Sequence, residues 1–417
     1  MNTHLRIRLW IVPGTFLAAA LLLSSPAVLA APRSLVVRPP AAMGTYYPED
    51  PATLLKTVQD LFAAADAPEP AEAMVGCIAS PAPYGLAGSV TAQAFKNLKP
   101  GQYDRVIILS AAHMADIENC SVEAVDAFVT PLGPVPLDEE AMRQILFSPL
   151  FTARSLSYVR RSKRPPVHEY EYGVEALLPY LQERLHEFKL VPILVGGLTD
   201  AGGKFNPSAV DAIARVLRPI VNDRTLVVAS SSFTHFGNDF SNRPFNDNII
   251  ANIEHLDRQA FDCVLSLDMK CFVKYLDTTK NVIDGRHPIE ILMKLMPPQT
   301  RARILAYEVS AVKTGDENRS VSYAAFTFHD PLRPVLEARP DKVRPLPMRP
   351  VPAAQKPEGA PAENDAPAAP AEAQPKPADN AANAPAKSVG SAAVPNGNAP
   401  AGKTTTEKKK RNPWKTP

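Results

Sequence analysis

The chain has 417 residues, and 45 Lys and Arg against 43 Asp and Glu leave a formal net charge of +2. This balance, with no basic stripe in the globular part, argues against a nucleic-acid partner. The 4 cysteines, at positions 77, 120, 263 and 271, show no C-x-x-C spacing, which argues against a zinc ribbon or a thioredoxin motif. Their spacing selects no disulfide pair, and we expect Cys77 and Cys263 to be small core residues.

The N-terminus has the pattern of a secretory signal peptide. Arg6 and Arg8 precede an almost wholly apolar run over 9–23, and Val28-Leu29-Ala30 places small residues at the −3 and −1 positions of a cleavage site. We therefore expect residues 1–30 to be removed and the protein to be exported, either to a periplasm or as a secreted protein. The alternative is an uncleaved anchor, which is disfavoured because the apolar run is shorter than the roughly 20 residues that a spanning helix needs.

The last part of the chain, 339–417, is rich in Pro and Ala and has almost no aliphatic or aromatic side chains. Such a segment cannot bury enough apolar surface to offset the entropy lost on ordering, so we expect a disordered tail. The tail carries the basic run Lys408–Arg411 near its end. Two interpretations remain open: a solvated extension, or a tether to an anionic surface of the cell envelope.

Between these ends, residues 31–338 have the composition of a single globular domain. Strand patterns rich in β-branched residues alternate with amphipathic helical patterns. We expect strands over 74–80, 105–110, 190–195, 225–230, 303–309 and 320–328, and helices over 89–98, 173–186, 208–221 and 248–267 and from Pro288. The alternation predicts an α/β fold with a central, mostly parallel sheet covered by helices on both faces, and the last two strands are candidates for antiparallel pairing.

Polar segments follow two of the predicted strands, at the carboxyl ends where such sheets bind ligands. His113 lies just past 105–110, and His235 lies just past 225–230. Asp284 lies in a third polar segment, a loop that enters a helix. Two imidazoles and one carboxylate are the ingredients of an open iron(II) site. A single histidine is more often a surface or hydrogen-bonded residue than a ligand, and these distant segments carry no local signature.

A collinear series of short segments carries a resemblance to a known family. The series begins with Gly44-Thr45-Tyr46-Tyr47-Pro48, continues through Val191–Gly196, the Ser-rich run that ends at His235 and Gly285-Arg286-His287-Pro288-Ile289, and closes with Ser320–Ala325. It resembles the Memo-like family, known in bacteria as AmmeMemoRadiSam system protein B. The resemblance spans nearly the whole domain and implies the fold of the class III extradiol ring-cleavage dioxygenases.

The resemblance also places the family's metal pocket on this sequence. The first metal His of the family falls on Pro81, which has no donor atom to offer a metal. The second falls on His113, which is retained. The third ligand, a Cys in the Memo branch and a carboxylate in the dioxygenases, falls on Asp284. The second-sphere His, an acid or base in the dioxygenases, falls on His235.

The rest of this pocket is altered as well. Ser232 stands where an Asp usually precedes the second-sphere His, and Tyr172 stands where the family has a His. Glu171 and Glu175 are retained. Tyr84, in the same segment as Pro81, is a further candidate to line the pocket.

Two interpretations of the pocket remain open. In the first, the metal site is degenerate and holds no cofactor, and the exported domain is a non-catalytic binding or scaffold protein whose partner is an unidentified protein or small molecule. In the second, His113, His235 and Asp284 form a rearranged site for iron(II) or manganese, and the protein is a non-heme dioxygenase-type oxidoreductase. We expect the first, because a metal site needs all of its ligand positions held.

Overall fold

The computed structural model describes residues 35–153, 166–200 and 202–348. The expected signal peptide, residues 1–30, and the tail beyond residue 348 lie outside these ranges. The described residues from Val36 onward belong to one unit. No helix within them is long and apolar enough to cross a membrane.

Four parallel strands, β2, β9, β3 and β8, form the middle of a sheet of nine described strands. The sheet runs in the order β10-β12-β2-β9-β3-β8-β4-β7, and β11 also pairs with β12. The bounds are β2 Ala73–Ala79, β3 Arg105–Ala111, β4 Cys120–Val122, β7 Phe151–Ala153, β8 Lys189–Val195, β9 Thr225–Ser230, β10 His235–Gly237, β11 Arg301–Val309 and β12 Arg319–Asp330. The first residues of β3, β8 and β9 lie side by side in the sheet, since Arg105 pairs with both Lys189 and Thr225.

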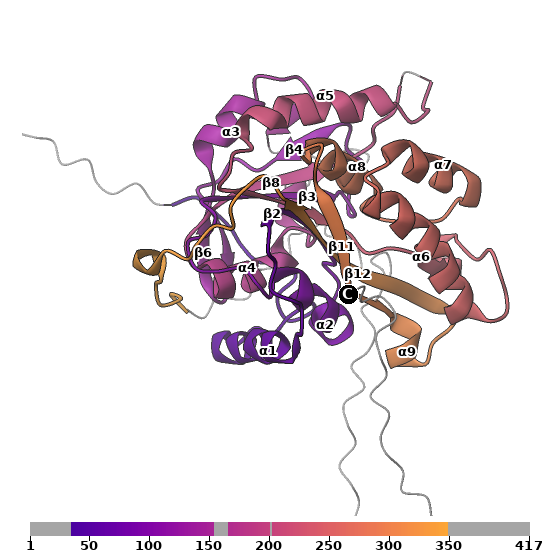
Figure 1. Cartoon of the computed structure of the whole chain (residues 1–417), viewed down its shortest axis with the longest axis horizontal. Helices are drawn as coiled ribbons and strands as arrows, with labels where there is room; N and C mark the ends of the chain where they lie inside the picture. Colours follow the sequence, from indigo (N-terminus) through magenta and orange to yellow (C-terminus); the bar gives the residue numbers. More distant parts are fainter. Residues whose placement is uncertain (1–34, 154–165, 201, 349–417) are drawn as a thin grey trace, which may run out of the picture. The chain divides into compact units, whose positions relative to one another are not determined.

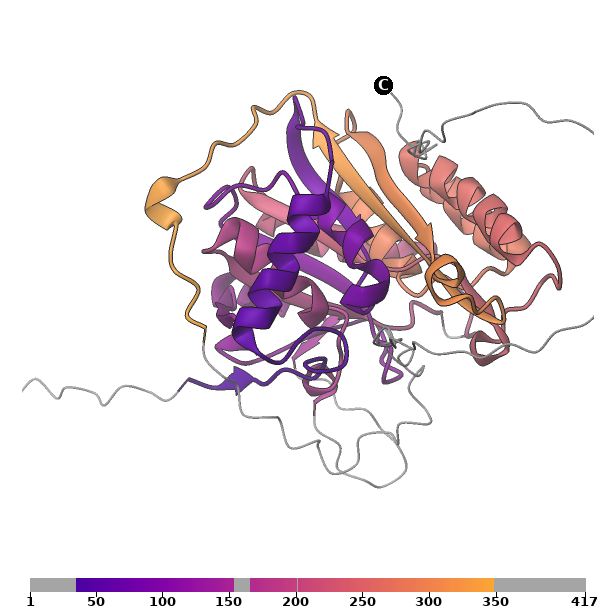
Figure 2. The same ribbon diagram turned by 90° about the horizontal axis from the view of Figure 1, so that it is seen from below.

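The middle strands are apolar because helices cover both faces of the sheet, and every residue of β2 and β9 is buried. One face is covered by α1, α2 and α4, and the other by α5, α6, α7 and α8 (Figures 1 and 2). The bounds are α1 Pro51–Ala64, α2 Tyr84–Phe95, α4 Leu178–Leu185, α5 Pro207–Leu217, α6 Ile249–Leu265, α7 Met269–Thr279 and α8 Arg286–Leu295. The predicted α/β class, with helices on both faces of the sheet, is therefore confirmed.

The edges of the sheet depart from the parallel arrangement. Strand β12 is antiparallel to both β2 and β11, as expected for the two late strands, and β4 is antiparallel to β8. Helices α1, α3 (Glu139–Ile145) and α7 are absent from the sequence-based predictions. The start of α1 is well defined, because the Asp50 side chain accepts the Thr53 amide at 2.8 Å and Pro51 fills the first turn.

A separate three-stranded sheet is formed by β1 (Val37–Arg38), β5 (Ala127–Thr130) and β6 (Gly133–Pro136). The described beginning of the Pro- and Ala-rich tail, up to Met348, runs along the domain. The Arg339 side chain donates to the Gly101 carbonyl at 2.6 Å, and Arg344 donates to Glu187 at 2.7 Å. Both contacts lie close to the first residues of β3 and β8, at the end of the sheet opposite to the carboxyl ends of those strands.

Candidate functional site

A cavity of about 530 Å³ lies at the carboxyl ends of the parallel strands. Pro81 reaches it from the end of β2, and Ser232 reaches it from the end of β9. The other lining residues are Tyr46, Ala82, Pro83, Leu86, Tyr172, His235, Asp239, Phe240, Asp284, Ser310, Thr314, Asp316, Arg319, Val321 and Tyr323. The cavity therefore lies where sheets of this kind bind ligands, beyond the carboxyl ends of the parallel strands.

His113, just past β3, lies between two carboxylates. Its Nδ1 is 3.2 Å from Glu171 Oε2, and its Nε2 is 3.4 Å from Asp284 Oδ2. The other Glu171 oxygen accepts the Met114 amide at 2.6 Å, which fixes the carboxylate against the backbone. Burial opposes protonation of His113, but the hydrogen bonds and charges of Asp284 and Glu171 outweigh burial and raise its pKa to about 10. The two flanking carboxylates therefore favour the protonated, imidazolium form of His113.

Asp284 is held in place by three donors on its second oxygen. Its Oδ1 accepts from the Ser231 hydroxyl at 3.1 Å, the Ser232 amide at 2.9 Å and the Gly285 amide at 2.6 Å. Burial alone would raise the pKa of Asp284, but the hydrogen bond from His113 and the charges of His235 and His113 keep it below its usual value. Asp284 is therefore a carboxylate that is hydrogen-bonded on both oxygens.

Gly285 allows this close approach. A Cβ atom at residue 285 would lie 2.8 Å from the Ser230 carbonyl oxygen and would collide with the Ser231 side chain. Only glycine therefore leaves room for the loop to lie against the end of β9, where Asp284 meets the Ser231 and Ser232 donors.

A stack of three rings lies beside this part of the cavity, and two of them line it. Tyr172 stacks on His113 with ring centroids 4.5 Å apart, and Tyr46 stacks on the other side of Tyr172, also at 4.5 Å. Tyr172 and Tyr46 line the cavity, whereas His113 is not among the lining residues, and its side chain is only 12% exposed. Tyr172 therefore lies between the imidazolium and the cavity.

His235, at the start of β10, has a different environment. Its Nδ1 lies 2.9 Å from the Phe233 carbonyl oxygen, which can only accept, so Nδ1 is the donor in this bond. The edge of the ring meets Phe240 at a centroid distance of 5.0 Å. On the same wall, Arg319 lies over Phe240 and pairs with Asp239 at 3.1 Å. Sequence reasoning missed Asp239, Phe240 and Arg319, and no motif in the chain marks them.

Besides His113, two further predicted pocket residues lie outside the lining. Tyr84 is buried in α2, where its hydroxyl donates to the Ala176 carbonyl at 2.9 Å. Glu175 is completely buried and forms an ion pair with the equally buried Arg38. It also accepts the Ala41 amide at 2.7 Å and the Ala42 amide at 2.9 Å. Glu175 thus anchors the segment that leads from β1 towards α1.

The described side chains around this cavity do not form a complete set of metal ligands. Within the described ranges, no three His, Cys, Asp or Glu residues are grouped so that they could hold a metal ion. At the position of Pro81 there is no donor atom, and the two nitrogens of His113 both face carboxylates. The residues present therefore fit an ion pair better than they fit a coordination sphere.

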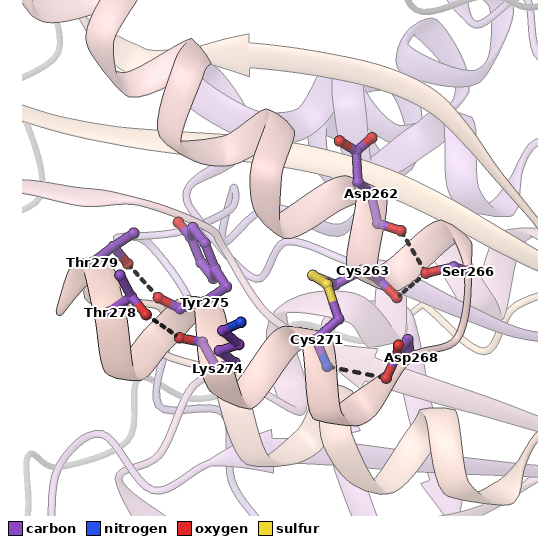
Figure 3. Close-up of a disulfide and its surroundings, with 9 residues drawn as sticks. All are labelled: Asp262, Cys263, Ser266, Asp268, Cys271, Lys274, Tyr275, Thr278 and Thr279. Carbon is purple, nitrogen blue, oxygen red and sulfur yellow. Dashed lines mark hydrogen bonds between the residues drawn. A yellow bond between two sulfur atoms is a disulfide. The ribbon is translucent and has the colours of Figure 1, made fainter.

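The cysteines differ from the expectation in one respect. Cys77 and Cys263 are both buried, as predicted, but Cys263 forms a disulfide with Cys271 that joins α6 to α7 (Figure 3). Cys77 and Cys120 are free thiols, and burial raises the pKa of each well above the usual value.

A model of the Memo-like protein family matches residues 38–327. The chain belongs to this family. The human Protein MEMO1 is 29% identical over 262 residues, which cover 60% of this chain and 83% of that protein. A MEMO1 family protein of Schizosaccharomyces pombe is 27% identical over 326 residues, covering 70% of this chain and 99% of the yeast protein. Among solved structures, an uncharacterized protein from Escherichia coli K12 matches 61% of this chain with 13% identity and a TM-score of 0.37.

Proposed function

We propose that this Memo-like domain is an exported binding protein that takes a small molecule or a partner segment into the cavity at the strand ends, without metal-dependent catalysis. The observation that carries the proposal is the placement of His113 between Glu171 and Asp284. An imidazolium has no lone pair for a metal, and each of its N–H groups already has a carboxylate acceptor.

The replacements in the pocket support the same conclusion. Pro81 offers no ligand atom at the first metal position of the family, and Tyr172 places an aromatic ring between His113 and the cavity. The remaining cavity wall offers aromatic faces, a paired Arg319 and the side chain of His235. Such a mixture of apolar surface and a few polar groups is typical of a binding site for a small molecule.

Export is supported by two separate features. The N-terminal residues have the basic, apolar and small-residue order of a signal peptide. The Cys263–Cys271 disulfide is a bond that persists in oxidising compartments and is rare in a reducing cytosol. We infer that the domain works in the cell envelope or outside the cell, where the basic tail end is either a solvated extension or a tether. Cell fractionation with and without residues 1–30 tests the export, and removal of residues 349–417 tests the anchoring.

The competing function is a metal-dependent oxidoreductase of the extradiol type. It is favoured by one observation: Asp284 lies 3.4 Å from His113 and lines the same cavity as His235. For this function a metal ion would have to replace the proton between His113 and Asp284 and would need His235 as its third protein ligand.

Metal binding separates the two functions. The protein is incubated anaerobically with a micromolar excess of iron(II) or manganese(II), and bound metal is measured after gel filtration. We expect less than stoichiometric metal, at the same level in wild type, His113→Ala and Asp284→Ala. The control variant is His255→Ala, an exposed histidine on α6. Stoichiometric metal that His113→Ala and Asp284→Ala lose, and that His255→Ala retains, would overturn the proposed function.

A further inference from the structure

The disulfide joins two helices that are bonded to the segments carrying His235 and Asp284. Cys263 lies in α6 and Cys271 near the start of α7, 8 residues apart in sequence, with Cα atoms 5.4 Å apart (Figure 3). Cys263 is buried, whereas Cys271 is partly exposed, so a reductant in solution can reach the bond. The Asp268 side chain accepts the Cys271 amide at 3.0 Å and caps α7 beside the disulfide.

The other end of α7 is tied to the loop that carries Asp284. Asn281 follows the last turn of the helix, and its side-chain amide donates to the Tyr275 hydroxyl at 2.7 Å. Its backbone amide donates to the Thr279 hydroxyl at 3.2 Å. Asn281 is only 7% exposed, so these bonds are made inside the protein. The position of α7 therefore determines where the 281–284 loop begins.

Asn281 also connects this loop to the segment of His235. Its side-chain nitrogen donates to the Thr234 hydroxyl at 2.7 Å, and its side-chain oxygen accepts from the Asn242 side chain at 3.2 Å. Asn242 donates in turn to the His235 carbonyl at 2.7 Å, and the His235 amide donates to the Val282 carbonyl at 2.9 Å.

Helix α6 holds the same segment from its other side. The Asp257 carboxylate accepts the Thr234 hydroxyl at 2.6 Å and the Tyr307 hydroxyl at 2.7 Å. Asp257 is completely buried, and the disulfide lies less than two helical turns further along α6, at Cys263. The two helices that supply Asp257 and Tyr275 to one buried network are therefore the two helices that the disulfide joins.

We propose that the Cys263–Cys271 disulfide is a redox-sensitive brace for the wall of the cavity that carries His235 and Asp284. In the oxidised protein the bond fixes α7 against α6 and keeps the Asn281 network assembled. Reduction by a dithiol breaks the sulfur–sulfur bond, adds two electrons and two protons to form two thiols, and converts the dithiol into its own disulfide. The reduced helices then lose a covalent constraint, and the wall that depends on them opens locally more often.

Hydrogen exchange of the full chain measures this effect directly. Amide exchange is followed by mass spectrometry in the oxidised protein and after reduction with dithiothreitol under native conditions. We expect exchange in 233–237 and 280–286 to accelerate by roughly tenfold, while exchange in β3 stays unchanged, because local openings are independent of global unfolding in a stable core. Unchanged exchange in the two segments, or an equal acceleration in β3, would overturn the proposal.

The double variant Cys263→Ser/Cys271→Ser is the matched control. It should show the accelerated exchange without reductant and should not respond to dithiothreitol. A response to dithiothreitol in the double variant would assign the effect to something other than this disulfide and would also overturn the proposal. Neither result depends on whether the cavity binds a metal, so the brace and the proposed binding function can fail separately.

Discussion

His113 Nε2 and Asp284 Oδ2 lie 3.4 Å apart, although 171 residues separate them in the chain. His113 follows a central strand of the sheet, and Asp284 lies in the loop between α7 and α8. Glu171 Oε2 lies 3.2 Å from the other ring nitrogen of His113, so the imidazole has a carboxylate on each side. The stability of this carboxylate–imidazole–carboxylate arrangement can be tested at Asp284.

Replacement of Asp284 by Ala should lower the free energy of unfolding by about 2–4 kcal/mol. The substitution removes the acceptor of three donors from Ser231, Ser232 and Gly285 and leaves His113 with one carboxylate. Urea denaturation measures the loss. The control is Asp277→Ala, an exposed aspartate on α7, which should cost less than about 0.5 kcal/mol. Equal losses in the two variants would contradict the role of Asp284.

The contribution of Asp257 should make stability depend on pH. Burial raises its pKa to about 6, against the opposing hydrogen bonds from Ser322, Thr234 and Tyr307. A carboxyl group whose folded pKa is raised contributes stability below its unfolded pKa, near 4, and that contribution is lost as the pH rises through the folded pKa. As the pH rises from about 4 to about 6, Asp257 therefore lowers the free energy of unfolding progressively, compared with a side chain that does not titrate.

The Asp257→Asn variant isolates this effect. The free energy of unfolding of the variant minus that of wild type should rise by about 2–3 kcal/mol between pH 4 and pH 7. Urea denaturation at a series of pH values gives this difference directly. A difference that stays constant would mean that the bonds from Thr234 and Tyr307 balance the effect of burial on the pKa, and one that falls with pH would mean that they outweigh it.

Replacement of Glu175 by Gln should cost about 3–5 kcal/mol, because it leaves the buried Arg38 guanidinium without a counter-charge. The loss should appear as a lower melting temperature and as faster hydrogen exchange around β1. The double variant Arg38→Met/Glu175→Gln removes both charges and should recover a large part of the stability. If the double variant is as unstable as Glu175→Gln, the unpaired charge is not the cause.

Glycine 285 should not tolerate a methyl group. Gly285→Ala places a Cβ atom 2.8 Å from the Ser230 carbonyl and against the Ser231 side chain, so the loop must move away from β9. We expect a loss of about 1–3 kcal/mol in chemical denaturation. The matched control is Gly85→Ala in α2, where a Cβ atom meets nothing within 4 Å and should stabilise the helix by up to about 1 kcal/mol. Similar effects at both glycines would show that the close approach at Gly285 is unimportant.

Much of the fold could be predicted because strand and helix periodicity is a local property. The pattern over 105–110 corresponds to β3, and the pattern over 225–230 corresponds to β9. The signal of helix α1 is also present in the sequence, since Asp50 and Pro51 mark its start and Leu54, Val58 and Phe62 repeat every four residues. Strand β10 is different, since its three residues carry no period and exist as a strand only through pairing with β12.

The candidate site could be predicted in part. The rule about strand ends predicts that His235 lies at the cavity, and the family resemblance adds Pro81, Ser232 and Asp284; all four line it. The separate role of Glu175 could not be predicted, because whether a retained carboxylate faces a cavity or a buried arginine depends on a residue 137 positions away. The same is true of the disulfide, since the cysteine spacing was compatible with several pairs.

The α/β class, the family and the lack of a ligand atom at position 81 can all be inferred from the amino-acid sequence, because each depends on residue type and local order. The three-dimensional fold is needed to show that His113 lies between two carboxylates beneath Tyr172, and that Cys263 meets Cys271 beside the hydrogen bonds of Asn281. Such contacts depend on the register of parallel strands and on the packing of helices across them, which place atoms from distant segments within a few ångströms of each other.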